Sequence, residues 1–238
     1  MKILVLFDID GTILKFNNEL GKRIFIDFLE KYLEREIPQE SIPDFSGMTD
    51  LKILQQITEY INLPFKQLEQ KLPDLWESLN SYFGEYCVDD NFEVMPGVRQ
   101  LIDELHSNQN VTLGLLTGNI KQNAYSKLKA VGLDHYFSFG SFGCEYADRN
   151  KLPQVAIEKA NTHLSKNHFK TENTIILGDS PRDIECAKSN NIPVICTATG
   201  NFSTTQLENF KPDYLFEDFS DYKLVMSSIF EHFKVNYE

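Results

Sequence analysis

The sequence predicts an α/β fold in which a doubly wound, parallel (Rossmann-like) sheet carries an inserted all-α cap. Two observations favour the sheet: short apolar runs of β type recur along the chain, and helical patterns lie between them. A third observation, a long interval that contains helical patterns but no strand-like run, favours the cap. We therefore predict an α/β core made of residues 1–14 and 94–238 and an α-helical cap made of residues 15–93.

The strand-like runs are nearly continuous in apolar character, which is typical of parallel strands covered by helices on both faces. They are Ile3–Phe7, Val111–Leu116, Thr174–Leu177, Pro193–Cys196 and, more weakly, Tyr214–Phe216. Helices are predicted after Pro96, after Asn119, through Val155 to Ala160, and from Pro181. The resulting β-α-β order predicts parallel strands joined by helical crossovers.

The cap is predicted from three helical stretches, Gly21–Arg35, Asp50–Ile61 and Phe65–Tyr86. Segments near residues 14–19 and 88–95 are the expected hinges, and Asp44–Asp50 reads as a loop that ends in a helix N-cap. The alternative is a helical subdomain that packs rigidly on the sheet and does not control access to a site.

Composition excludes several classes of function. The 238 residues carry a formal net charge of -12, so a nonspecific binder of nucleic acid or of an anionic membrane would work against its own field. The four cysteines form no C-x-x-C pair, which argues against zinc and against a disulfide framework. No apolar stretch is long enough for a signal peptide or a membrane span, so we expect a cytoplasmic protein. The sequence does not indicate an oligomeric state.

Polar groups follow each of the three strong strand-like runs. Asp8 and Asp10 follow the first, Thr117-Gly118-Asn119 ends the second, and Gly178-Asp179-Ser180 ends the third. Ligands of open parallel sheets bind outside the carboxyl ends of the strands, so we expect these groups to meet in one site.

The acidic groups predict a metal site. Two carboxylates one residue apart repel each other and need a counter-ion, and Asp179 adds a third acid. Mg²⁺ suits a site made of a few carboxylates, water and phosphate oxygens. A calcium loop is the alternative. It is disfavoured because Asp8 follows a hydrophobic strand, and because the residues between Asp8 and Glu19, the twelfth position of such a loop, do not follow the ligand pattern of a calcium loop.

The other two motifs occur where a strand turns into a helix. Thr117, Gly118 and Asn119 provide backbone N–H groups and a hydroxyl for an anion, although such a turn is also simply a good helix start. In "GDSPRD", Ser180 is expected to cap a helix whose first turn holds Asp183. Asp183 is then either part of the metal shell or a capping-box acid, and the two roles are compatible.

Together "DIDGT", "LLTGN" and "GDSPRD" resemble the ordered motifs of the haloacid dehalogenase superfamily, in particular its phosphoglycolate-phosphatase-like branch with a helical cap. The resemblance spans the chain. It implies that Asp8 is the nucleophile that forms an aspartyl-phosphate and that Asp10 is the general acid and base. It also implies that the carbonyl of Asp10 completes a metal shell with Asp8 and Asp179.

In the same resemblance, Thr117 and the N–H groups of Gly118 or Asn119 would hold the phosphoryl oxygens. The family normally supplies a further Lys or Arg before the third motif, but the expected Lys-Pro pair is missing here. Arg149 and Lys151 are the alternatives, of which we favour Arg149. Either residue would otherwise be a solvated charge before a helix.

The expected function is a Mg²⁺-dependent phosphatase that acts on phosphate monoesters of small metabolites. A phosphomutase of the β-phosphoglucomutase type shares these motifs, and a non-catalytic binding module on the same scaffold is a further alternative. Dehalogenation is disfavoured because a departing halide needs no proton donor at Asp10. The loop Asp44–Asp50 is the expected determinant of substrate choice.

Overall fold

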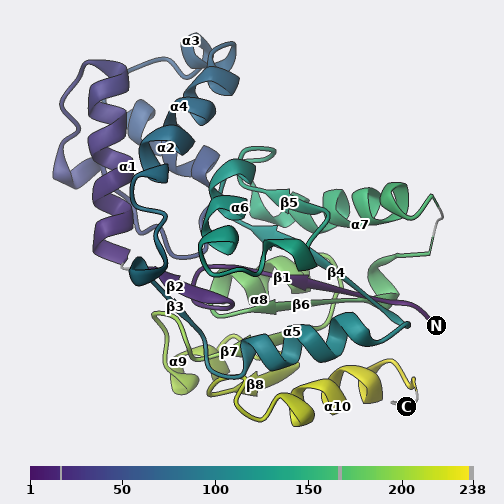
Figure 1. Cartoon of the computed structure of the whole chain (residues 1–238). Helices are drawn as coiled ribbons and strands as arrows, with labels where there is room; N and C mark the ends of the chain where they lie inside the picture. Colours follow the sequence, from purple (N-terminus) through teal and green to yellow (C-terminus); the bar gives the residue numbers. More distant parts are fainter. Residues whose placement is uncertain (17, 166–167, 236–238) are drawn as a thin grey trace.

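The computed structural model describes residues 1–16, 18–165 and 168–235, and it contains a six-stranded parallel sheet with helices on both faces (Figure 1). The strand order is β5-β4-β1-β6-β7-β8. The strands are β1 (Ile3–Phe7), β4 (Val111–Thr117), β5 (Gly140–Phe142), β6 (Thr174–Gly178), β7 (Val194–Thr197) and β8 (Tyr214–Phe216). The predicted doubly wound α/β sheet is therefore confirmed.

The centre of the sheet is the point at which the chain order reverses. Strand β1 pairs with β4 on one side and with β6 on the other, so that Phe7 has both Leu115 and Leu177 as register partners. The carboxyl ends of β1, β4 and β6 consequently lie next to one another, which is where a ligand of such a sheet binds.

Alternate residues of β1 belong to different cores. Ile3, Val5 and Phe7 pack in one core, and Leu4 and Leu6 pack in the other, as expected for a strand buried on both faces. The first core receives α5 (Val98–Ser107), α6 (Lys121–Ala130) and α10 (Tyr222–His232). The second receives α7 (Leu152–His163), α8 (Pro181–Ser189) and α9 (Thr204–Glu208).

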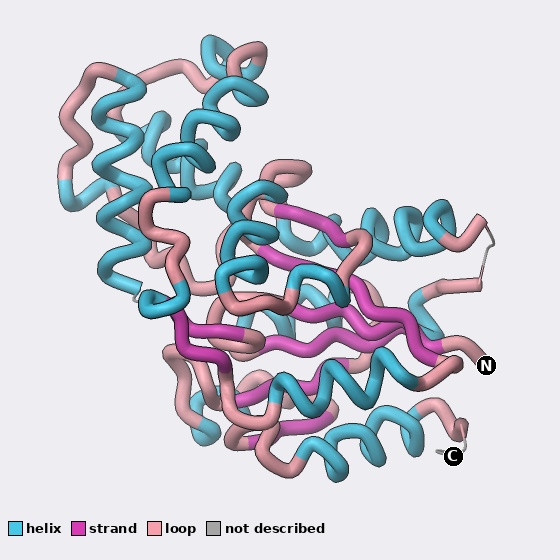
Figure 2. Tube along the Cα trace, viewed as in Figure 1, coloured by secondary structure: helices cyan, strands magenta, loops and turns pink. Residues whose placement is uncertain are grey.

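The inserted segment forms a separate helical layer over the carboxyl edge of the sheet, away from both termini (Figures 1 and 2). Its helices are α1 (Asn18–Leu33), α2 (Asp50–Tyr60), α3 (Lys66–Glu69) and α4 (Leu72–Gly84). They enclose a core of their own around Leu29, Leu54 and Leu75. Short 3-10 turns complete the described fold: η1 (Gln39–Ser41), η2 (Asp89–Asn91), η3 (Asp134–Tyr136), η4 (Arg149–Lys151) and η5 (Thr171–Asn173).

The expectation that residues 15–93 contain no strand is wrong at both hinges. Strands β2 (Leu14–Phe16) and β3 (Phe92–Val94) pair antiparallel and connect the cap to the core. Each is three residues long, too short for an alternating pattern, and the ribbon is held by tertiary packing of Phe16 on Phe92, whose ring centroids lie 5.0 Å apart. Residue 17, in the first hinge, lies outside the described residues. No helix in the described ranges combines the length and apolar character that a bilayer span requires.

Candidate active site

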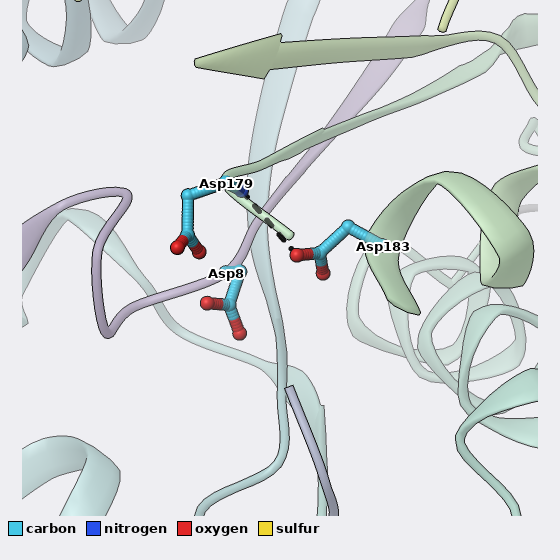
Figure 3. Close-up of side chains that lie close together, drawn as sticks. All are labelled: Asp8, Asp179 and Asp183. Carbon is cyan, nitrogen blue, oxygen red and sulfur yellow. Dashed lines mark hydrogen bonds between the residues drawn. The ribbon is translucent and has the colours of Figure 1, made fainter. Parts of the chain in front are cut away.

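Three carboxylates meet at the carboxyl edge of the sheet. One ligand oxygen each of Asp8, Asp179 and Asp183 lies within 4.8 Å of the others (Figure 3). Asp8 continues β1 and its N–H donates to the carbonyl of Leu177 at 2.9 Å, which aligns it with the end of β6. The expected approach of Asp8 to Asp179 is therefore present, because their strands are neighbours in register.

Glycines make room for the Asp179 carboxylate. A Cβ atom at Gly11, whose φ is +89°, would come within 2.3 Å of Asp179 Oδ2, and one at Gly200 would come within 1.6 Å. Only glycine fits both constraints at Gly11, namely the left-handed backbone and the close approach. The hydroxyl of Thr12 donates to Asp179 Oδ1 at 3.3 Å.

Asp183 makes the predicted capping box. Its Oδ2 accepts from the N–H and the hydroxyl of Ser180, at 3.1 and 2.6 Å, and the Ser180 hydroxyl in turn caps α8. The Oδ1 atom accepts from Arg149 at 2.6 Å. Both oxygens thus hold other site residues in place, while the carboxylate stays in the acidic cluster.

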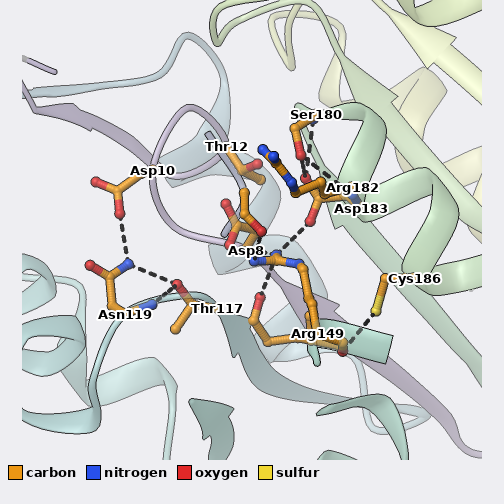
Figure 4. Close-up of polar contacts among 12 residues, drawn as sticks. Asp8, Asp10, Thr12, Thr117, Asn119, Arg149, Ser180, Arg182, Asp183 and Cys186 are labelled. Carbon is orange, nitrogen blue, oxygen red and sulfur yellow. Dashed lines mark hydrogen bonds and ion pairs between the residues drawn. The ribbon is translucent and has the colours of Figure 1, made fainter. Parts of the chain in front are cut away.

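Arg149 is buried between two of these acids. Its Nη2 donates to Asp8 Oδ1 at 2.9 Å and to Asp183 Oδ1, so a single guanidinium bridges β1 and α8 (Figure 4). The other candidate cation, Lys151, is exposed and lies over the ring of Tyr146 at 5.5 Å. Of the two sequence alternatives, the structure brings Arg149 into contact with Asp8.

The acidic cluster has an excess of negative charge. Burial raises the pKa of Asp8 to about 7 although Arg149 lowers it, and burial together with the charges of Asp183 and Asp8 raises the pKa of Asp179. Burial alone would lower the pKa of Arg149, but the carboxylates of Asp183 and Asp8 raise it. One guanidinium does not offset three buried acids, and this donor set of carboxylate oxygens fits a hard divalent cation.

The side chain of Asp10 lies outside this cluster, which corrects the expectation that Asp8 and Asp10 share one counter-ion. Its two carboxylate oxygens each accept from Lys127 Nζ at 2.7 Å, and Oδ2 also accepts from Asn119 Nδ2 at 2.7 Å. Each acid has its own cation, Arg149 for Asp8 and Lys127 for Asp10. The metal contact expected of residue 10 would involve its backbone carbonyl and not this side chain, and it stays a prediction.

The motif Thr117-Gly118-Asn119 begins at the last residue of β4. The buried Thr117 hydroxyl accepts from the Asn119 N–H at 3.3 Å and from Asn119 Nδ2 at 2.8 Å, which fixes the turn (Figure 4). A Cβ at Gly118 would come within 1.9 Å of the Met48 carbonyl. Thr117, Gly118 and Asn119 therefore line the same pocket as Asp8 and Asp179, with the cap loop packed against them.

The cap loop is bonded to the core beside the site. Asp50 N–H donates to the Gly118 carbonyl at 2.8 Å, and Asp50 Oδ2 accepts from the Ile120 N–H at 2.7 Å. Arg149 Nη1 donates to the Gly47 carbonyl at 3.2 Å. Burial raises the pKa of Asp50 to about 7. The loop expected to choose the substrate thus forms one wall of the pocket.

Sequence reasoning missed two site residues, Lys127 and Asp50. Lys127 looks like one more lysine of a helix that also carries Lys121 and Lys129. The sequence predicts Asp50 only as the end of a loop that finishes in a helix N-cap, whereas the N-cap of α2 is Thr49 and Asp50 is the first residue of the helix. The four-residue spacing of Asn123 and Lys127 places both on one side of α6, but this spacing does not by itself indicate a contact with Asp10.

A family model described as haloacid dehalogenase-like hydrolase matches residues 5–197. Pyrophosphatase PpaX of Oceanobacillus iheyensis is 25% identical over 232 residues, which cover 95% of this chain and 97% of that protein. Pyrophosphatase PpaX of Listeria monocytogenes is 26% identical over 220 residues, covering 91% and 93%.

Two solved structures share the fold. A predicted phosphatase from Clostridium acetobutylicum has a TM-score of 0.67 at 22% identity and covers 95% of this chain and 99% of its own. The β-phosphoglucomutase of Clostridium difficile has a TM-score of 0.70 at 18% identity and covers 98% and 99%. The TM-scores establish a shared fold, and identities this low support nothing beyond the fold.

Proposed function

The chain belongs to the haloacid dehalogenase-like hydrolases, and from that premise we propose that it is a Mg²⁺-dependent phosphatase of small phosphate monoesters that acts through an aspartyl-phosphate. The observation that carries the proposal is the position of Asp8, at the end of the central strand, beside Asp179 and bonded to Arg149. The family and its named relatives support a phosphatase; the metal and the substrate class are the finer parts of the proposal.

Asp8, Asp179 and the carbonyl of Asp10 would hold the divalent ion, and Asp183 would orient Asp179, Ser180 and Arg149 around it. When bound, the ion supplies positive charge that favours the ionised form of Asp8 and neutralises phosphate oxygens. That supply matters because burial raises the pKa of Asp8 to about 7, and only the ionised carboxylate is a nucleophile.

In the first step an oxygen of Asp8 attacks phosphorus and the bond between phosphorus and the leaving oxygen breaks, while Asp10 protonates the leaving oxygen. In the second step water attacks phosphorus, Asp10 accepts a proton from it, and the bond to Asp8 breaks. Arg149 offsets the charge of Asp8, and Thr117, Gly118 and Asn119 orient the phosphoryl oxygens.

The pocket under the cap favours compact substrates. Apolar side chains of the cap form its outer wall, namely Phe25, Phe45, Met48, Ile53, Leu79 and Phe83. The relatives named pyrophosphatase make inorganic pyrophosphate a substrate to test beside the monoesters.

The test is a panel of about a hundred phosphorylated metabolites, including pyrophosphate, 2-phosphoglycolate and hexose monophosphates, with phosphate release measured in the presence of Mg²⁺. Release that depends on Mg²⁺ and on Asp8 supports the proposal. Product analysis with a hexose monophosphate and a trace of bisphosphate separates the phosphomutase alternative, which yields an isomer. Absence of turnover across the panel with metal-loaded protein would favour a binding module.

A further inference from the structure

Lys127 of α6 is a nearly buried lysine whose ammonium group lies inside the candidate active site. Its side chain is 9% exposed, whereas the Asp10 carboxylate that it contacts is 35% exposed. A lysine is almost never buried to this extent unless it is paired. Both residues line the candidate pocket, and the Asp10 side chain is the more exposed of the two.

Lys127, Asp10 and Asn119 form a closed triangle of hydrogen bonds. Lys127 Nζ donates to both oxygens of Asp10 and to Asn119 Oδ1, all at 2.7 Å. Asn119 closes the triangle by donating from Nδ2 to Asp10 Oδ2. The same Nδ2 donates to the Thr117 hydroxyl at 2.8 Å, so the triangle is joined to the turn Thr117-Gly118-Asn119. These bonds fix both the rotamer and the plane of the Asp10 carboxylate.

The cap completes the surroundings of the triangle. Lys127 Nζ lies 5.6 Å from the ring centroid of Phe83, on cap helix α4. Nearby, the Ser126 hydroxyl of α6 donates to Asn80 Oδ1 of α4 at 3.0 Å. The triangle thus lies where α6 of the core meets the cap.

We propose that Lys127 is a positioning residue, which holds Asp10 on the leaving-group side of the pocket so that it can protonate the departing oxygen. The inference rests on the proposed function, because it assigns Lys127 a role through Asp10. A general acid must lie within about 2.6–3.2 Å of the oxygen that it protonates, and an Asp side chain without fixed partners samples several staggered rotamers. The ammonium and Asn119 select one of them.

The test compares two aryl phosphates of nearly the same shape, phenyl phosphate and p-nitrophenyl phosphate. The phenolate leaves poorly unless it is protonated, whereas p-nitrophenolate leaves without a proton. Their kcat/KM values report only the steps up to the loss of the aryl group, and so do not include hydrolysis of the aspartyl-phosphate. The variant is Lys127→Met, which keeps the apolar stem and removes the ammonium. The matched control is Lys129→Met, an exposed lysine of the same helix.

In Lys127→Met, kcat/KM for phenyl phosphate is expected to fall about 10²-fold and that for p-nitrophenyl phosphate less than about threefold. Lys127→Arg is expected to restore part of the loss, and Lys129→Met is expected to leave both substrates unchanged. Thermal unfolding is measured for every variant, and Lys127→Gln replaces Lys127→Met under the same criterion if the methionine variant does not fold.

Equal losses with the two esters would overturn the inference, since they would indicate a phosphate-binding or purely structural lysine. Unchanged kcat/KM with phenyl phosphate would overturn it as well. A wild-type protein that hydrolyses neither ester, nor any compound of the metabolite panel, would instead remove the proposed function, and the role of Lys127 with it.

Discussion

Replacing Arg149 by methionine tests the electrostatics of the site most directly. The guanidinium is 7% exposed and donates to Asp8 and Asp183 at 2.9 and 2.6 Å. Methionine keeps much of the apolar stem but leaves both buried carboxylates without their cation. Breaking a buried ion pair from one side costs about 3–5 kcal/mol. Since each kcal/mol lowers Tm by about 2–4 °C in a chain of this size, we expect a loss of about 10 °C at pH 7.5.

The loss should depend on pH in a defined direction. Burial already raises the folded-state pKa of Asp8 from 3.8 to about 7, and removal of Arg149 raises it further. A raised carboxyl pKa means that the stability contributed by the protonated acid is present at low pH and is lost as pH rises through the folded-state value. Asp8 is protonated in both folded proteins near pH 5, so the part of the deficit of Arg149→Met that depends on ionisation of Asp8 should be absent there and should grow as pH rises through about 7.

The assay is thermal unfolding followed by circular dichroism at several pH values between 5 and 8, in the presence of a chelator. Lys151→Met is the matched control, because Lys151 is exposed and two residues away, and it should change stability by less than about 0.5 kcal/mol. In activity assays with Mg²⁺, Arg149→Met should lose turnover and Lys151→Met should retain it. Equal Tm values for the two variants, or a deficit that is constant from pH 5 to pH 8, would refute this account of Arg149.

Three further perturbations address the nucleophile, the metal and the cap. Asp8→Asn should keep the fold and lower kcat by at least about 10⁴-fold, measured as phosphate release; appreciable turnover by a clean preparation would remove Asp8 from the nucleophile role. Chelation should stop turnover and added Mg²⁺ should restore it, whereas an enzyme indifferent to chelator would contradict the metal assignment. Asp50→Asn should gain stability relative to wild type as pH rises from 4 to 8, because burial raises the pKa of Asp50 from 3.8 to about 7 and the wild type loses the contribution of the protonated acid over that range. The gain in free energy of unfolding, read from unfolding midpoints, is at most about 4 kcal/mol, and the exposure of part of Asp50 to the pocket makes it smaller. Identical pH profiles of stability for Asp50→Asn and wild type would exclude Asp50 as the titrating group.

The sheet was predictable because its central strands are continuous apolar runs whose polar groups start where the strand ends. Ile3–Phe7, followed by Asp8, is the clearest case. Strand β5 is different, because it is only three residues long and begins with Gly140, a residue type depleted from strands, and the segment is extended through its pairing with β4. The close packing of Gly140 on Leu115, where a Cβ would lie 2.6 Å from the leucine side chain, is seen only in the structure.

The acids of the site were predictable for the same reason, but their partners were not. Parallel register brings Asp8 and Asp179 together regardless of loop sequence, so residue type and strand position are sufficient. The direction of Asp10 depends on Lys127, which lies 117 positions away on a helix that carries other lysines. Only the three-dimensional packing of α6 against the site distinguishes Lys127 from Lys121 and Lys129.

Arg149 also connects the chemistry of the core to the position of the cap. One arm of its guanidinium, Nη2, binds Asp8 and Asp183, and the other, Nη1, donates to the Gly47 carbonyl of the cap loop. A lysine at this position has a single ammonium, a compact point charge that lacks the two arms of the fork. Arg149→Lys should therefore keep most of the neutralising charge while it loosens the contact between loop and core. The cation that offsets the nucleophile is thus also one of the groups that bind residues 44–50 to the core, beside the two hydrogen bonds of Asp50, and this links charge balance to the position of the cap loop.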